Sequence, residues 1–129
     1  MINSGILNPQ ILSLLARVRH TNALVIADRG FPSWPQVETV DISLVDGVPT
    51  VLQVLAAVRD YCSYNHAFMA REFQQHNAAA TRAKFAKCLS GIPTRFEPHA
   101  KFKKRVPDAI GLIRTGDTIQ YANMILISG

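Results

Sequence analysis

The segment from Ala23 to Ala27 constrains the fold more than any other part of the sequence. It reads Ala-Leu-Val-Ile-Ala, is apolar throughout, and carries β-branched side chains at Val25 and Ile26. A short continuous apolar run of this kind predicts a strand that is buried on both faces. Strands buried on both faces belong to parallel sheets with helices on either side. We therefore expect an α/β protein.

The rest of the chain alternates between helix and strand signals. Asn8 followed by Pro9 predicts a helix start, and Thr50 with Gln53 forms a capping box for a second helix. We expect helices at 9–19, 51–58, 77–89 and just after residue 98, and strands at 23–27, 40–44, 67–70, 109–113 and 124–127.

Length and composition bound the architecture. The chain has 129 residues, of which 48% are hydrophobic, which fits one domain covering 1–129 with a full core. The alternation predicts a three-layer α/β sandwich around a mainly parallel, Rossmann-like sheet. Only 18% of residues are charged, slightly below average, which indicates that further surface is buried in a homo-oligomer.

The sequence also indicates a compartment. No apolar run approaches the ~20 residues of a membrane span. The run 11–16 resembles the apolar part of a signal peptide, but no basic residue precedes it and Asn8-Pro9 predicts a helix there instead. Cys62 and Cys88 have no metal or redox spacing, so we expect two free thiols in the cytoplasm.

The net charge of +5 raises the possibility of a nucleic-acid partner. Basic residues concentrate between Arg82 and Arg105. No helix-turn-helix, RNP-type or zinc-finger spacing accompanies them, and aromatic residues are not interleaved. A solvated helix face with a general attraction for anions is the favoured interpretation.

Motifs of several enzyme classes are absent. The sequence holds no Gly-x-Gly-x-x-Gly, no Walker-type Gly-Lys-Ser/Thr and no Gly-x-Ser-x-Gly. His66 and His76 have no carboxylate at metal-ligand spacing. The residues favour a protein without cofactor or metal that binds something small and polar.

His20 and Asp28 are the candidate acid–base pair. Asp28 follows the predicted strand, where ligands of α/β sheets bind, and an imidazole titrates near neutral pH. Structural roles are open for both, since His20 can interact with a helix C-terminus and Asp28 can cap a turn. A short connection could bring the two together, although the two ends of a strand usually lie on opposite edges of the sheet.

Four ordered segments resemble the ribose pyranase and fucose mutarotase family, and more closely its D-ribose pyranase branch. The segment His20–Pro32 resembles the family's His-Thr-Asp motif and the strand that ends in Asp-x-Gly-Leu-Pro. Gly47–Leu55 resembles its central helix start. Ile113–Asp117 and Tyr121–Leu126 resemble the closing Ile-Arg-Thr/Ser-Gly-Glu and Tyr-Ala-Asn-x-Ile-Leu motifs. The match runs in order from residue 5 to 127.

This resemblance implies an isomerase that interconverts pyranose and furanose, or anomeric, forms of a free monosaccharide, with D-ribose expected. L-fucose or another aldose is an alternative substrate, and a non-catalytic sugar-binding regulatory module is an alternative function. The family needs no cofactor or metal. The resemblance also implies a homodecamer of two pentamers with sites at subunit contacts.

The resemblance assigns a role to five residues. His20 would be the proton donor, and Asp28 would bind sugar hydroxyls and orient or charge-tune His20. His99, Tyr121 and Asn123 would bind the sugar. Without the resemblance, the sequence pattern predicts that His99 is a surface residue and that Tyr121 packs against its neighbours.

The sequence departs from the family pattern in the first motif. Arg29 stands where the family has a small residue, and its side chain could point into the site, contact a neighbouring subunit or bind an anion. Phe31 replaces a leucine, Ala100 replaces an acid beside His99, and Asp117 shortens a glutamate. These changes bear on the choice of substrate more than on the reaction.

Overall fold

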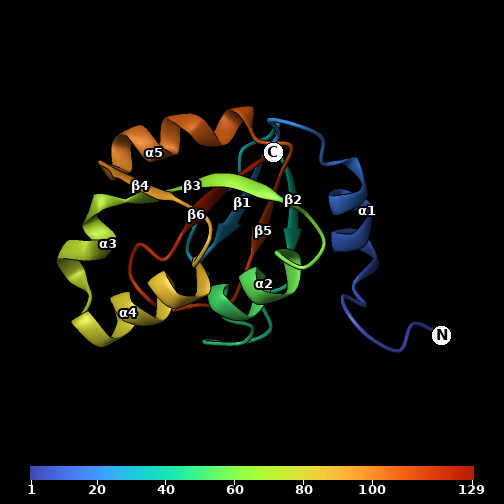
Figure 1. The fold of residues 1–129 in the computed structure, drawn as a ribbon, viewed down its shortest axis with the longest axis horizontal. Coiled ribbons are helices and arrows are strands. Elements are labelled where there is room, and N and C mark those ends of the chain that lie inside the picture. Colours follow the sequence, from blue (N-terminus) through green and yellow to red (C-terminus); the bar gives the residue numbers. More distant parts are fainter.

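A computed structural model describes all 129 residues. Six strands form one sheet in the order β2-β5-β1-β6-β3-β4, with helices on both faces (Figure 1). The strands are β1 (Ala23–Ala27), β2 (Glu38–Asp41), β3 (Tyr64–Ala70), β4 (Thr94–Glu97), β5 (Gly111–Arg114) and β6 (Met124–Ser128). The helices are α1 (Pro9–Arg17), α2 (Val51–Val58), α3 (Arg71–His76), α4 (Ala79–Cys88) and α5 (His99–Arg105).

The sheet is mainly parallel, as predicted, with one exception in its interior. β1 pairs in parallel with β5, β5 with β2, and β3 with β4. β6 lies between β1 and β3 and is antiparallel to both. The first residue of β6 therefore lies at the edge of the sheet where β1 and β3 end.

Alternate residues of β1 enter two separate cores. Leu24 and Ile26 pack with residues of α1, α2 and α4, whereas Val25 and Ala27 pack with residues of α5. All four side chains are fully buried, and full burial stabilises the fold by about 1.5–3 kcal/mol for each of the larger three. Figure 1 shows α5 on one side of the sheet and α2 and α4 on the other. The three-layer prediction is confirmed.

Local signals fix the expected helix starts. The Asn8 side chain accepts a hydrogen bond from the Ile11 N–H and caps α1. The capping box of α2 is complete, because the Gln53 N–H donates to the Thr50 hydroxyl (3.1 Å) and the Thr50 N–H donates to the Gln53 side-chain carbonyl (2.9 Å).

The prediction of a strand at 40–44 is wrong in its position. β2 ends at Asp41, whose carboxylate accepts a hydrogen bond from the Ser43 N–H (3.0 Å) and turns the chain away from the sheet. Leu44 is 76% exposed. The elements α3 and β4 were not predicted, nor was the short 3-10 helix at Val106–Asp108. α3 lacks a side-chain cap, and β4 is a short edge strand without an apolar run.

The turn after β5 connects three parts of the molecule. The Thr115 hydroxyl donates to the Ala27 carbonyl (2.8 Å), and the Asp117 carbonyl accepts from the Arg29 N–H (3.1 Å). The buried Asp117 carboxylate accepts from the Val51 N–H (2.8 Å) at the start of α2, where a negative charge is favourable. This turn holds the loop that follows β1.

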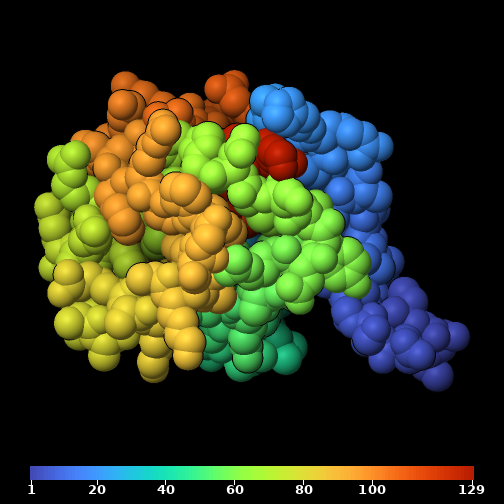
Figure 2. All heavy atoms as spheres, in the orientation of Figure 1, coloured from blue at the N-terminus to red at the C-terminus, as the bar shows by residue number.

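The N-terminal residues project from the body of the molecule (Figure 2), and Met1 and Ile2 are exposed. None of the helices combines the length and the apolarity that a membrane crossing requires.

Candidate active site

A cavity of about 470 Å³, lined mostly by polar residues, opens beyond the carboxyl end of β1. Its lining comprises Asp28, Gly30, Phe31, Pro32, His76, His99, Lys103, Gln120, Tyr121 and Asn123. Four of the five predicted site residues lie here, namely Asp28, His99, Tyr121 and Asn123. Tyr121 and Asn123 meet Asp28 because the antiparallel β6 begins where β1 ends. His99 joins them because β4, which is parallel to β3, ends at the same edge of the sheet.

Asp28 is held by hydrogen bonds on both sides. Its N–H donates to the Asn123 side-chain oxygen (2.7 Å), and its carboxylate accepts from the Gly30 N–H (2.9 Å). Burial raises the pKa of Asp28, while hydrogen bonds with Gly30 and the Asn123 side chain oppose that rise. The carboxylate is thus a better proton acceptor than an exposed aspartate.

His99 begins α5 and is fixed through its backbone. Its N–H donates to both carboxylate oxygens of Glu72 (3.1 Å each), and its ring packs against Phe31 and Phe102. Burial lowers the pKa of His99, and the charge of Lys103 lowers it further. Both effects favour the neutral form of the imidazole. Its Nδ1 is buried without a hydrogen-bond partner.

Tyr121 occupies a strained backbone position between two histidines. Its φ is +57°, a left-handed conformation that costs a residue other than glycine about 1–3 kcal/mol. The ring centroid lies 5.1 Å from His99 and 5.4 Å from His76. The preceding Gln120 carbonyl accepts from the Asn77 side-chain amide (2.9 Å), which ties this loop to the end of α3.

Sequence reasoning missed Lys103 and His76. Lys103 lies four residues after His99, so the two share one face of α5, and that spacing was the available signal. His76 ends α3, a helix without a start signal, and nothing local in the sequence points to it. No group of three or more His, Cys, Asp or Glu side chains is arranged to hold a metal ion.

His20 lies elsewhere in the structure. It is exposed and lines a different cavity, of about 450 Å³, together with Cys62, Ser128 and Gly129. It precedes β1, whereas Asp28 follows β1, and a strand of this length spans roughly 16 Å. The sequence left open whether a short connection brings His20 and Asp28 together. The structure places the two residues at opposite ends of β1, in different cavities.

Arg29 does not line the polar cavity. Its guanidinium forms an ion pair with Asp46 (2.7 Å) on the surface, and both side chains are more than half exposed, so the pair contributes little to stability. Phe31 does form part of the cavity wall, where its ring packs edge-on against Phe102 and His99.

The model of the RbsD / FucU transport protein family matches residues 1–129. The chain belongs to this family. The family membership that the sequence motifs led us to expect is thereby confirmed.

Relatives of this RbsD / FucU family member match it over its whole length. The D-ribose pyranase of Geobacillus kaustophilus is 40% identical over 129 residues, covering 100% of this chain and 94% of the relative. That of Laribacter hongkongensis is 40% identical, with 100% and 98% covered.

Solved structures of the RbsD / FucU family agree with the fold. RbsD of Bacillus subtilis, complexed with D-ribose, has a TM-score of 0.92 and 32% identity, and the match covers 100% of this chain and 98% of that chain. The fucose mutarotase of Streptococcus pneumoniae, in complex with L-fucose, has a TM-score of 0.80 and 20% identity, with 95% and 92% covered, and shows the same fold.

Proposed function

We propose that this protein is an isomerase that interconverts the pyranose and furanose forms of free D-ribose. The observation that carries the proposal is the polar cavity that gathers Asp28, His99, Tyr121 and Asn123. The identity of 40% to D-ribose pyranases over the full chain supports it. The similarity to a ribose-complexed RbsD structure supports ribose over other aldoses.

The reaction requires only proton transfers. When the ring opens, the anomeric hydroxyl loses a proton, the bond between C1 and the ring oxygen breaks, and the ring oxygen gains a proton. A different hydroxyl then adds to the aldehyde carbon and closes the new ring, and this hydroxyl loses its proton while the carbonyl oxygen gains one. Groups that exchange protons near neutral pH accelerate such steps by about 10²–10⁴-fold, so no cofactor is needed.

The cavity residues suit this chemistry. Asp28, with its raised pKa, is positioned to accept a proton from a sugar hydroxyl. A sugar hydroxyl would give the unpartnered Nδ1 of His99 a hydrogen bond. Asn123 and Tyr121 carry groups that both donate and accept, which matches the hydroxyls of a monosaccharide.

We propose that His20 acts as proton donor in the cavity of a neighbouring subunit. His20 is exposed and lies roughly one strand length from Asp28 of its own chain. A homo-oligomer in which His20 of one subunit faces the Asp28 cavity of the next would complete the site, and the expected decamer of two pentamers is such an assembly.

A non-catalytic sugar-binding module is the second candidate. The separation of His20 from the cavity favours it, because one subunit holds the sugar-binding residues without the proposed donor. Both candidate functions include binding of the sugar, but only the isomerase accelerates the interconversion of its ring forms.

Exchange spectroscopy by NMR tests both candidates. Exchange between the pyranose and furanose signals of ribose should accelerate when the protein is added, and His20→Ala should reduce this acceleration by about 10²–10⁴-fold. Ribose binding without accelerated exchange would establish the binding module instead. L-fucose and other aldoses in the same assay determine the substrate.

We also propose a cytoplasmic location, which the two thiols support. Cys62 and Cys88 are both unpaired. Burial raises the pKa of the Cys88 thiol, so that it stays protonated and unreactive at neutral pH. Recovery of the activity in the cytoplasmic fraction of the source cells tests this location.

A further inference from the structure

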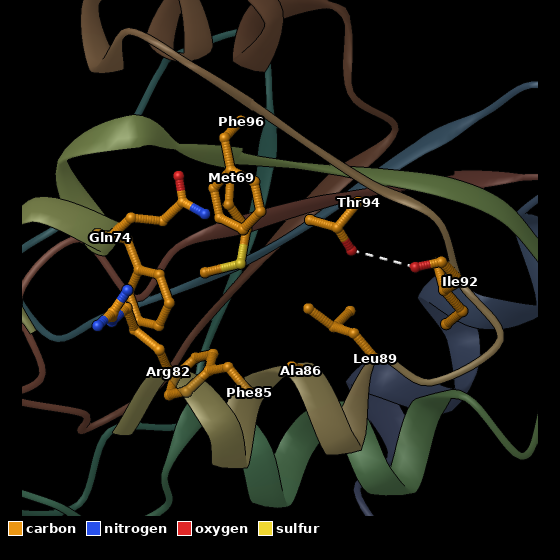
Figure 3. Close-up of a pocket in the computed structure, with 10 residues that line it drawn as sticks. Met69, Gln74, Arg82, Phe85, Ala86, Leu89, Ile92, Thr94 and Phe96 are labelled. Atoms are coloured by element: carbon orange, nitrogen blue, oxygen red, sulfur yellow. Dashed lines mark hydrogen bonds between the residues drawn. The ribbon is translucent and has the colours of Figure 1, made fainter. Parts of the chain in front are cut away.

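A second cavity, of about 300 Å³, lies between α4 and the strands β3 and β4 (Figure 3). It shares no lining residue with the cavity at Asp28. Its inner wall is apolar and consists of the buried side chains of Met69, Phe73, Phe85, Leu89 and Ile92. Such a lining does not match the hydroxyls of a sugar.

One face of α4 forms the floor of this cavity. Arg82, Phe85, Ala86 and Leu89 recur at spacings of three and four, so they share that face, and all four line the cavity. Ala86 is short and leaves the space between its neighbours open. The Phe85 ring is fixed by packing on Phe73, at 4.7 Å between ring centroids.

One end of the cavity is polar and positively charged. Figure 3 shows Gln74 and Arg82 at one end and Thr94 with Ile92 at the other. The Thr94 hydroxyl already donates to the Ile92 carbonyl (3.1 Å), whereas Arg82 forms none of the salt bridges of the protein.

The surrounding chain adds to the positive charge. Residues 74–96 contain four basic side chains and no acidic one; the four are Arg82, Lys84, Lys87 and Arg95. No carboxylate of this segment therefore competes with a ligand for the Arg82 guanidinium, and the electrostatic field at this end of the cavity attracts anions.

We propose that this cavity binds a small amphipathic carboxylate, with its apolar tail between Met69 and Leu89 and its carboxylate on Arg82. The volume lies at the lower end of the range for small-molecule pockets, which suits a short aliphatic or single-ring acid. Burial of the tail removes apolar surface from water, and the guanidinium supplies a charge-assisted hydrogen bond. The proposal does not depend on the sugar chemistry.

Methyl NMR of the full-length protein tests the proposal with hexanoate as the probe. The chain has three methionines, Met1, Met69 and Met124, of which Met69 alone lines the cavity. Hexanoate should shift the Met69 methyl signal in a saturable manner and leave the signal of the exposed Met1 in place. Hexanol, which has the same tail without the charge, should bind more weakly.

Two matched variants assign the charge. Arg82→Gln should weaken hexanoate binding by about three- to tenfold, the effect of a charge contact at a partly exposed rim, and should leave hexanol binding unchanged. Lys84→Gln removes the same charge from an exposed position of α4 outside the cavity, and should weaken hexanoate binding less than Arg82→Gln does while leaving hexanol binding unchanged. Ala86→Phe fills the cavity from its rim and should abolish the Met69 shift with either probe.

Three outcomes would overturn the proposal. The first is the absence of a saturable Met69 shift with hexanoate. The second is an equal loss of binding in Arg82→Gln and Lys84→Gln, which would indicate general attraction of anions. The third is a smaller assembly of Ala86→Phe in sedimentation velocity, which would show that a second copy of the chain covers this cavity.

Discussion

His20 and Asp28 lie at opposite ends of β1, and each lines a cavity of its own. The strand between them is buried in the centre of the sheet and paired on both sides, so no local rearrangement can bring the two side chains together. The proposed reaction therefore needs His20 from one subunit and Asp28 from another.

Mixed oligomers should reveal this arrangement. His20→Ala and Asp28→Asn should each lower the rate of ribose ring exchange by about 10²–10⁴-fold. When the two variants are unfolded together and refolded, some cavities combine an intact Asp28 with an intact His20 from a neighbour, and part of the activity should return. NMR exchange of the mixture, compared with each variant refolded alone, makes the measurement. A mixture as inactive as its parents contradicts the shared site.

The stability of Asp28→Asn should exceed that of the wild type at neutral pH. Burial raises the folded-state pKa of Asp28 above its ordinary value of 3.8, so the folded state binds the proton more tightly than the unfolded state. Wild-type stability is then lost as the pH rises from 3.8 through the raised pKa. Asparagine carries no such penalty, and its side-chain oxygen still accepts from Gly30. Urea denaturation should show an advantage of Asp28→Asn at pH 7 that shrinks toward pH 4; a variant less stable at pH 7 contradicts the assignment.

Removal of the Lys103 charge should raise the pKa of His99. Burial is the larger cause of the lowered pKa, and Lys103 is the second, so Lys103→Gln should move the titration of His99 upward without restoring its ordinary value. Lys104→Gln removes an equal charge from an exposed neighbouring position and is the control. Titration of the histidine ring signals by NMR makes the comparison, and an equal shift in both variants would show a general effect of charge.

Gly116→Ala should destabilise the fold. A Cβ at this position would collide with the backbone carbonyls of Val45 and Val48, and backbone cannot move aside as a flexible side chain can. We expect a loss of about 1–3 kcal/mol in the free energy of unfolding. Gly30→Ala is the control, because its nearest neighbour would be a carboxylate oxygen of Asp28 at 3.7 Å, and its loss should stay below about 0.5 kcal/mol. If denaturant titrations give the same loss in the free energy of unfolding for Gly116→Ala and Gly30→Ala, the backbone has moved to relieve the collision.

The parts of the fold that depend on local pattern were predictable. β1 has the predicted bounds because a continuous apolar run carries its own signal, and the start of α2 follows from the capping box of Thr50 and Gln53. α3 and β4 were not predicted, because α3 has no cap and β4 is held in place by its pairing with β3.

The site was predictable only in part from the residues themselves. Asp28 follows from the rule that ligands bind beyond strand ends. Tyr121 and Asn123 came from the family resemblance alone, since the direction of β6 depends on pairing with distant strands and leaves no mark in its own residues. His76 depends in the same way on the unpredicted α3.

The antiparallel β6 also bears on the order in which the molecule is assembled. β6 is last in the chain, yet it lies between β1 and β3 and is the only strand that joins the β2-β5-β1 part of the sheet to the β3-β4 part. Until β6 is in place, no strand connects these two parts, and β1 and β3 each have an unpaired edge facing the gap. β6 must enter this gap before Asn123, which directly precedes it, can bond to the Asp28 N–H. Pairings between such distant segments slow folding, and edges left open in the meantime are sites of aggregation.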